Sequence, residues 1–168
     1  MKTQVDIGTT DVLNVVRELR EKRFTGYLAL CIKGQKGLEE ATLLFDNGKV
    51  IGSGYEYYAY SKELFGEKAF QRFLNATAAK NGTLDAFETT LEQLHLVLAF
   101  HDEAVFVPQD QHLNRVKVPE FSPLLELEVQ KEAPQKTPED LRKKYKLQAA
   151  TQEEAPVTLP RHEEGKTA

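Results

Sequence analysis

A turn signal in the first half of the chain places the strongest constraint on the fold. Between residues 24 and 60, two runs rich in β-forming residues flank the sequence Asp46-Asn47-Gly48-Lys49. Asn-Gly between apolar runs is the strongest short-range signal for a β-hairpin, because a type I′ turn needs positive φ at both central residues. The sequence therefore predicts two antiparallel strands, over about residues 39–46 and 49–58.

Two more strands are expected beside this hairpin. Gly26 opens the β-rich run Tyr27–Lys33, which ends in the turn signals of residues 34–37. A shorter strand is expected at Thr83–Glu88, after the helix stop signal Asn81-Gly82. Together these segments predict a small antiparallel meander of about three to four strands.

About three helices are predicted around this meander, which makes the fold class α+β. Apolar residues at helical spacing follow N-cap side chains at residues 9–11 and predict a helix over 10–22. After Ser61 the apolar period changes, and a second amphipathic helix is expected from about Leu64 to Ala79. Thr90 and Gln93 fit a capping box that begins a third helix over Leu91–His101.

The third predicted helix is apolar on nearly all sides. Its apolar residues are Leu94, Leu96, Val97, Leu98 and Phe100. A helix of this kind is either central to a core or buried against a partner.

The composition changes at Pro108. All seven prolines of the chain lie from this residue onward, among Gln, Glu and Lys, which is typical of a linker or tail. We therefore expect a compact domain over residues 1–107 and an extended C-terminal arm over 108–168.

One or two segments of the arm are expected to fold on binding. The run Phe121–Val129 has mostly alternating apolar residues, which indicates either a strand or extended arm packed back on the domain or a partner-binding segment. Residues 137–145 combine an N-cap Thr, a Pro at the first helical position, acids in the first turn and bases in the last. They predict a short helix near 138–147, which forms when it docks.

Composition excludes several classes of function. A chain of 168 residues can hold one domain with a sizeable core. Its formal net charge of -4 does not attract nucleic acid, so we do not expect a nucleic-acid partner. No run reaches the ~18 apolar residues of a membrane span, and the N-terminus lacks the apolar core of a signal peptide. Cys31 is the single cysteine, so the expected location is the reducing cytoplasm, without membrane insertion.

No motif in the chain indicates catalysis, a metal site or a cofactor. His95 and His101 are six residues apart, so they face different sides of the third helix and cannot share a metal as an i, i+4 pair does. The glycines of residues 34–54 match neither the Walker spacing of phosphate loops nor the glycine fingerprint of dinucleotide-binding domains. We therefore expect a protein that is not an enzyme and that needs no cofactor.

Residues 55–60, with the sequence YEYYAY, are the most unusual composition in the chain. Alternation puts Tyr55 and Tyr57 on one face of a strand, with Tyr58 and Tyr60 on the other face or in the following loop. Tyrosine offers a large contact area with few torsions to order, so an exposed cluster is a candidate protein-binding surface. Alternatively, half of these rings cover the sheet and half cap the second helix. The candidate interaction residues are Tyr55, Tyr57, Tyr58, Tyr60, Leu141 and Tyr145.

The order of these signals resembles a known signalling domain. A short helix, the run Phe24–Leu28, a turn, the run Ala41–Gly54 and a helix with Ala-Phe are similar to the PatA N-terminal (PATAN) domain and to an uncharacterised archaeal family of similar layout. The matching positions are Thr25-Gly26, Phe45, Gly48, Val50-Ile51 and Gly82. The resemblance covers about residues 5–105 and implies a non-enzymatic regulatory or adaptor module that works through protein contacts.

The function expected from the sequence is therefore a protein-interaction module, alone or as a subunit of a larger complex. It would dock on a partner protein through the tyrosine-rich region and the C-terminal arm. The alternative, from a different class, is a small-molecule or lipid-binding domain whose pocket is lined by the second and third helices.

Overall fold

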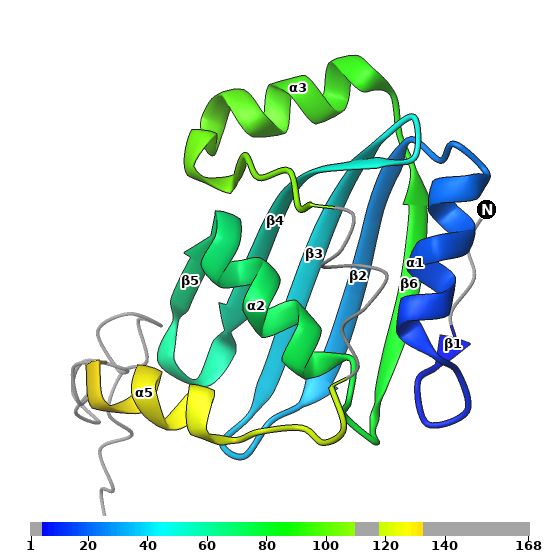
Figure 1. Cartoon of the computed structure of the whole chain (residues 1–168). Coiled ribbons are helices and arrows are strands. Elements are labelled where there is room, and N and C mark those ends of the chain that lie inside the picture. The colour runs from blue at the N-terminus through cyan, green and yellow to red at the C-terminus, as the bar shows by residue number, and fades with distance from the viewer. Residues whose placement is uncertain (1–4, 110–117, 133–168) are drawn as a thin grey trace, which may run out of the picture. The chain divides into compact units, whose positions relative to one another are not determined.

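A computed structural model describes residues 5–109 and 118–132, which belong to one compact unit, Met1–Ala133 (Figure 1). The elements are β1 (Val5–Asp6), α1 (Val12–Glu21), β2 (Gly26–Lys33), β3 (Leu38–Asp46), β4 (Lys49–Tyr57), η1 (Tyr58–Tyr60), β5 (Lys62–Phe65), α2 (Gly66–Ala76), β6 (Gly82–Glu88), α3 (Leu91–Phe100), η2 (Asp102–Ala104) and α5 (Leu124–Glu132). The expected α+β class is confirmed. The helix expected near 138–147 lies outside the described residues.

The described strands form one six-stranded sheet in the order β1-β6-β2-β3-β4-β5, and every neighbouring pair is antiparallel. The expectation of three to four strands was therefore too low. The two additional strands are the edge strands β1 and β5, which have two and four residues. Segments of two and four residues are too short to show the alternation of a strand in the sequence. They become strands because they pair with β6 and β4. β5 also includes Leu64 and Phe65, which had been assigned to the second helix.

The Asn-Gly turn joins β3 and β4 as expected. Asn47 and Gly48 have φ values of 46° and 78°, the positive values that a type I′ turn requires. The Gly48 N–H donates to the carbonyl oxygen of Phe24 at 2.8 Å. A Cβ at Gly48 would lie 2.3 Å from the carbonyl oxygen of Arg20, so this turn fits closely against the end of α1 only because the residue is glycine.

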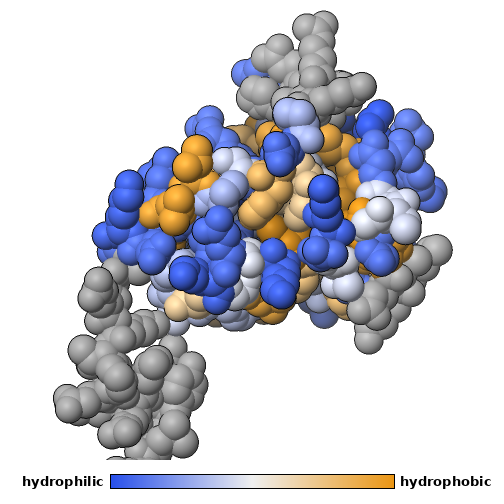
Figure 2. All heavy atoms as spheres, turned by 90° about the horizontal axis from the view of Figure 1, so that it is seen from below, coloured by the Kyte–Doolittle hydropathy of each residue, from blue (hydrophilic) through white to orange (hydrophobic). Residues whose placement is uncertain are grey.

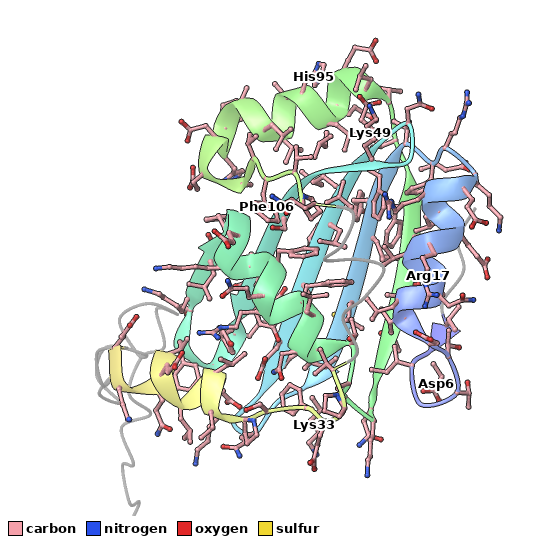
Figure 3. The ribbon with its side chains drawn as sticks, in the orientation of Figure 1. Asp6, Arg17, Lys33, Lys49, His95 and Phe106 are labelled. Atoms are coloured by element: carbon pink, nitrogen blue, oxygen red, sulfur yellow. The ribbon has the colours of Figure 1, made fainter. Side chains whose placement is uncertain are left out.

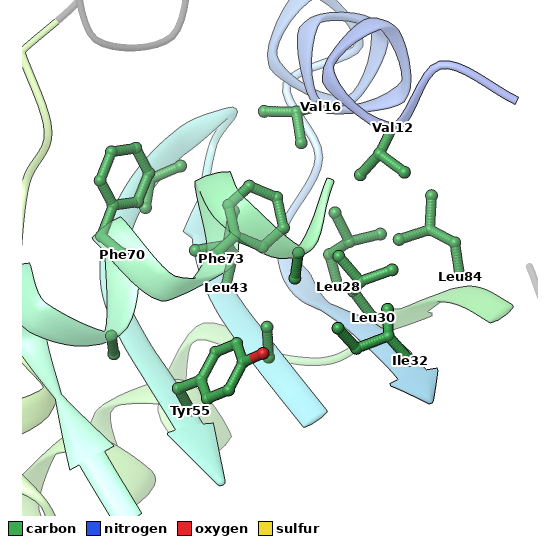
Figure 4. Packing of buried hydrophobic residues seen from close by; sticks show 14 of the residues in the cluster. Val12, Val16, Leu28, Leu30, Ile32, Leu43, Tyr55, Phe70, Phe73 and Leu84 are labelled. Carbon is green, nitrogen blue, oxygen red and sulfur yellow. The ribbon is translucent and has the colours of Figure 1, made fainter. Parts of the chain in front are cut away.

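The main core lies between one face of the sheet and the helices α1 and α2, which cover that face in Figure 1. The residues of β2 alternate between buried and half-buried, so every second side chain faces the helices. Figure 4 shows the resulting packing around Phe73 of α2 and Val16 of α1. Other members of this core are Val12, Leu28, Leu30, Ile32, Leu43, Tyr55, Phe70 and Leu84.

The run Phe121–Val129 packs on the main core, but its expected extended conformation was wrong. Residues from Leu124 form helix α5, in which the N–H groups of Glu126 and Leu127 donate to the carbonyl oxygen of Pro123. Its buried residues are Glu126 and Val129, three positions apart on one helical face. Because the inward position at residue 126 is a glutamate, the apolar residues alone showed a false period of two.

Candidate functional site

Helix α3 begins with the capping box that the sequence predicted. The Gln93 N–H donates to Thr90 Oγ1 at 3.3 Å, and the Thr90 N–H donates to Gln93 Oε1 at 3.1 Å. These two bonds satisfy backbone donors that the first turn of a helix leaves free. The sequence therefore fixes where α3 starts.

The described contacts of α3 leave most of its apolar side chains uncovered. Leu94 is its single buried residue, with 2% exposure, whereas Leu96, Val97 and Phe100 are 58%, 45% and 76% exposed. Leu96 and Phe100 are four residues apart, so they lie together on the side of the helix away from Leu94. We call Leu96 and Phe100 the α3 surface; Val97, although 45% exposed, lies on the Leu94 side of the helix.

The chain segment that carries the α3 surface is acidic. Between Leu91 and Val107 the chain carries Glu92, Asp102 and Glu103, all exposed, and no Lys or Arg. Exposed apolar side chains continue beyond the helix at Val105 and Val107. The next ring, Phe106, turns back and lies 5.3 Å from the Phe70 ring of α2 (Figure 3). This ring contact anchors the segment after α3 to the core.

A cavity of about 210 Å³ lies beneath α3, against the other face of the sheet. Val97 and His101 line it from the helix, and the His101 ring stacks on Phe65 at 5.5 Å. Glu40, Glu56 and Glu63 line its floor in one row, because they are register partners across β3, β4 and β5. In the described ranges, no group of His, Cys, Asp or Glu is arranged to hold a metal ion.

Cys31 lies beside the row of glutamates, and its thiol has low reactivity. Its sulfur is 3.6 Å from Glu40 Oε2, which also accepts a hydrogen bond from the Tyr58 hydroxyl at 2.9 Å. Burial, followed by the charge of Glu40, raises the pKa of the Cys31 thiol to about 11. The thiol therefore stays protonated near neutral pH, so Cys31 is a poor nucleophile and a poor metal ligand.

A larger cavity, of about 620 Å³, lies between α1 and the β2–β6 side of the sheet. Its apolar lining includes Val15 and Leu19 of α1 and Leu28 and Leu84 of the sheet. Charged side chains, among them Lys22, stand around it. The cavity beneath α3 is lined by Phe65, which had been assigned to the second predicted helix, and by Val97 and His101 of the third, but no residue of α2 as observed lines either of these two cavities.

The tyrosine run separates into two pairs. Tyr55 and Tyr57 are buried in the core on one face of β4, as alternation predicted, and their ring centroids are 5.0 Å apart. They are therefore not available to a partner in the folded protein, which corrects the expectation that they form an exposed surface. Tyr58 and Tyr60 lie in η1, where Tyr58 is exposed and Tyr60 is half-buried.

The other two candidates, Leu141 and Tyr145, lie outside the described residues. The sequence did single out α3, because its all-round apolarity indicated either a core or a partner contact. Only the contacts of the helix show that much of this apolar area faces solvent. No helix in the described ranges is long and apolar enough to cross a membrane.

A family of archaeal proteins shares this sequence pattern. The model of the DUF2226 family, whose description is an uncharacterized protein conserved in archaea, matches residues 2–101. The chain belongs to this family. In this DUF2226 chain the matched region extends through the end of α3, so it includes the α3 surface. The resemblance to an archaeal family of similar layout is therefore confirmed.

One curated relative comes from Archaeoglobus fulgidus. It carries the description of an uncharacterized protein and is 39% identical over 62 residues, which are 36% of this chain and 24% of the relative. The match thus spans about a quarter of the relative's length. No solved structure matches the DUF2226 chain.

Proposed function

We propose that this chain is a non-enzymatic protein-interaction module whose contact surface is centred on α3. The observation that carries the proposal is the exposure of Leu96 and Phe100, four residues apart on one side of the helix. Contiguous exposed apolar patches on soluble proteins often mark interaction sites. Burial of these two side chains against a partner would remove them from water.

The charge of this chain segment favours a partner of complementary chemistry. Because Glu92, Asp102 and Glu103 are close in the sequence to the apolar side chains, a complementary partner presents an apolar groove flanked by Lys or Arg. A helix that lays apolar side chains into such a groove is a recurrent mode of recognition. A partner of this kind would bind more weakly at high salt, since charges at an interface rim are screened.

The sequence resemblance to PATAN domains supports a regulatory or adaptor role for this interaction. A cytoplasmic location is part of the proposal, in keeping with a single cysteine, which has no second cysteine in the chain to pair with. Tyr58 and Tyr60 are proposed as secondary contacts with the partner. Leu141 and Tyr145 of the C-terminal arm are also proposed as contacts, on the basis of the sequence alone.

The test is a comparison of the full chain with two variants. Partners would be captured with the wild-type protein, identified by mass spectrometry, purified and titrated against each form. Leu96→Glu with Phe100→Glu places charge on the α3 surface, whereas His95→Glu adds charge at an exposed position of α3 outside that surface (Figure 3). We expect the double variant to bind at least ~100-fold more weakly, which corresponds to the loss of about 3 kcal/mol.

The control variant should bind within about threefold of the wild type. Circular dichroism would check that all three proteins are folded. Equal binding by the double variant would overturn the proposal. A wild-type protein that remains a lone monomer in its native extract would overturn it as well.

Ligand binding is a second candidate function, favoured by the cavity beside α1. Its volume of about 620 Å³ lies within the range of small-molecule sites, and its lining combines apolar side chains with a few charged ones. A ligand of this site would raise the melting temperature of the full chain. Leu19→Trp, which fills the cavity from α1, should abolish that rise. A rise that persists in Leu19→Trp would place the ligand elsewhere.

A further inference from the structure

Helix α5 and the residues before it dock at the end of the sheet that carries the β2–β3 turn. Val129 is buried in the main core, and Phe121 packs against it. Asn75 of α2 donates to the carbonyl oxygen of Ser122 at 3.0 Å and accepts from the Ser122 N–H at 2.8 Å. Seen from below, most of the described surface around this end is hydrophilic (Figure 2). The segment is therefore held by a few specific contacts.

The most specific of these contacts is made by Glu126, which is 3% exposed. Its Oε2 accepts from the Gln35 N–H at 2.7 Å, and its Oε1 accepts from the Lys36 N–H at 2.9 Å. The β2–β3 turn thus supplies two backbone donors to one carboxylate. Hydrogen bonds of this kind favour the charged form of the acid.

A second buried carboxyl group, that of Glu39 on β3, lies next to Glu126. Glu39 is also 3% exposed, and the Tyr55 hydroxyl donates to its Oε2 at 2.5 Å. Its Oε1 is buried without a hydrogen-bond acceptor or donor among the described residues when the acid is charged. A proton on Glu39 can instead be donated to Glu126. Two buried carboxylates side by side repel each other, so one of the pair holds a proton more readily.

The surroundings decide which acid holds the proton. Both oxygens of Glu126 accept hydrogen bonds from the turn, whereas Glu39 Oε1 has no hydrogen-bond partner among the described residues. Burial, with a smaller contribution from the neighbouring Glu126, raises the pKa of Glu39 to about 7. The Tyr55 hydrogen bond and the charge of Arg72 oppose this effect, and burial outweighs them. Arg72 Nη2 is itself 2.9 Å from Glu128 Oε2 of α5. The remaining groups near this pair are the hydroxyls of Tyr57 and Tyr60.

We propose that α5 is a proton-controlled latch, which is held on the sheet while Glu39 shares a proton with Glu126 and loosens when that proton is lost. Release of α5 would expose Val129, uncover the Glu39 carboxyl group to water and free the two N–H donors of the turn. The latch lies at the other end of the sheet from α3, and it does not depend on the proposed function of the α3 surface.

The direction of the pH effect follows from the two states of Glu39. With α5 released, water reaches the Glu39 carboxyl group and its pKa falls toward the ordinary value of 4.5, whereas in the docked state it is about 7. The docked state therefore binds more protons between these two values, and docking weakens as pH rises through them. Between about pH 5.5 and 7.5 a complete return to 4.5 gives a decrease of up to about 20-fold in the docking equilibrium constant.

Hydrogen exchange of the full chain, followed by mass spectrometry, measures this constant. The protection of the α5 amides would be compared at about pH 5.5 and 7.5, corrected for intrinsic exchange and referred to the amides of α1. We expect α5 of the wild type to lose up to about 20-fold of its protection relative to α1. Glu39→Gln is isosteric with the protonated acid and does not titrate, so its α5 protection should be equal at both pH values.

Glu132→Gln is the matched control, because it removes an exposed carboxylate of the same helix that pairs with Lys62. This variant should keep the pH dependence of the wild type. The proposal is overturned if wild-type α5 has the same protection at both pH values, or if Glu39→Gln retains the dependence. Carbon NMR titration of the Glu39 carboxyl group in the wild type is a second measurement, and an apparent pKa below about 5 would overturn it too.

Discussion

Helices α3 and α5 are nearly equal in length, but the more apolar of the two buries fewer residues. α3 is the more apolar and buries one of its ten residues, Leu94, whereas α5 contains several charged residues and buries Glu126 and Val129. Glu126 can be buried because the β2–β3 turn supplies donors for its carboxylate. Burial in this protein therefore depends on the complementary groups that face a helix, and apolarity alone does not determine it.

Removal of α5 should have the largest effect. A chain that ends at Val107 loses the core contact of Val129 and the reciprocal bonds between Asn75 and Ser122. Loss of the apolar contact and of these hydrogen bonds should lower the free energy of unfolding by about 3–5 kcal/mol. Urea unfolding measures this change. An unchanged midpoint would mean that residues 108–168 are an appendage that does not stabilise the domain, one of the alternatives that the sequence left open.

A single substitution on α5 should have an intermediate effect. Val129→Ala removes two buried methyl groups and should lower the free energy of unfolding by about 1–2 kcal/mol. Hydrogen exchange should show the loss first in α5 and the residues before it, since Val129 holds that segment. Uniform loss across the sheet would show that α5 does not open by itself.

The corresponding substitution on α3 should have the smallest effect on stability. Phe100 is 76% exposed, so Phe100→Ala should change the free energy of unfolding by less than about 0.5 kcal/mol. The same substitution should weaken binding of a protein partner, which titration of the purified partner would detect. A loss of several kcal/mol in the isolated chain would show that the α3 surface packs within this chain.

Much of the fold could be predicted from local signals. The Asn47-Gly48 turn and the capping box of α3 are set by neighbouring residues, so both are as expected. The edge strands β1 and β5 were missed because their partners β6 and β4 create them. Strand pairing between segments distant in the sequence leaves little trace in two or four residues.

The candidate site was predictable only in part. Alternation placed Tyr55 and Tyr57 on one face, but it could not say that this face meets the core. The apolarity of α3 offered two outcomes, burial in the core or against a partner. The contact between Glu39 and Glu126 joins residues 87 positions apart, and no local pattern connects them.

By itself the sequence determined the α+β class, the positions of α1, α2 and α3, and the hairpin, because side-chain spacing and turn chemistry act between near neighbours. Only the tertiary structure decided which faces are covered. It buries two tyrosines of the tyrosine run, leaves Phe100 in solvent and places Glu126 beside Glu39. The physical reason is that burial and carboxyl pairing depend on what the rest of the chain brings to the same place.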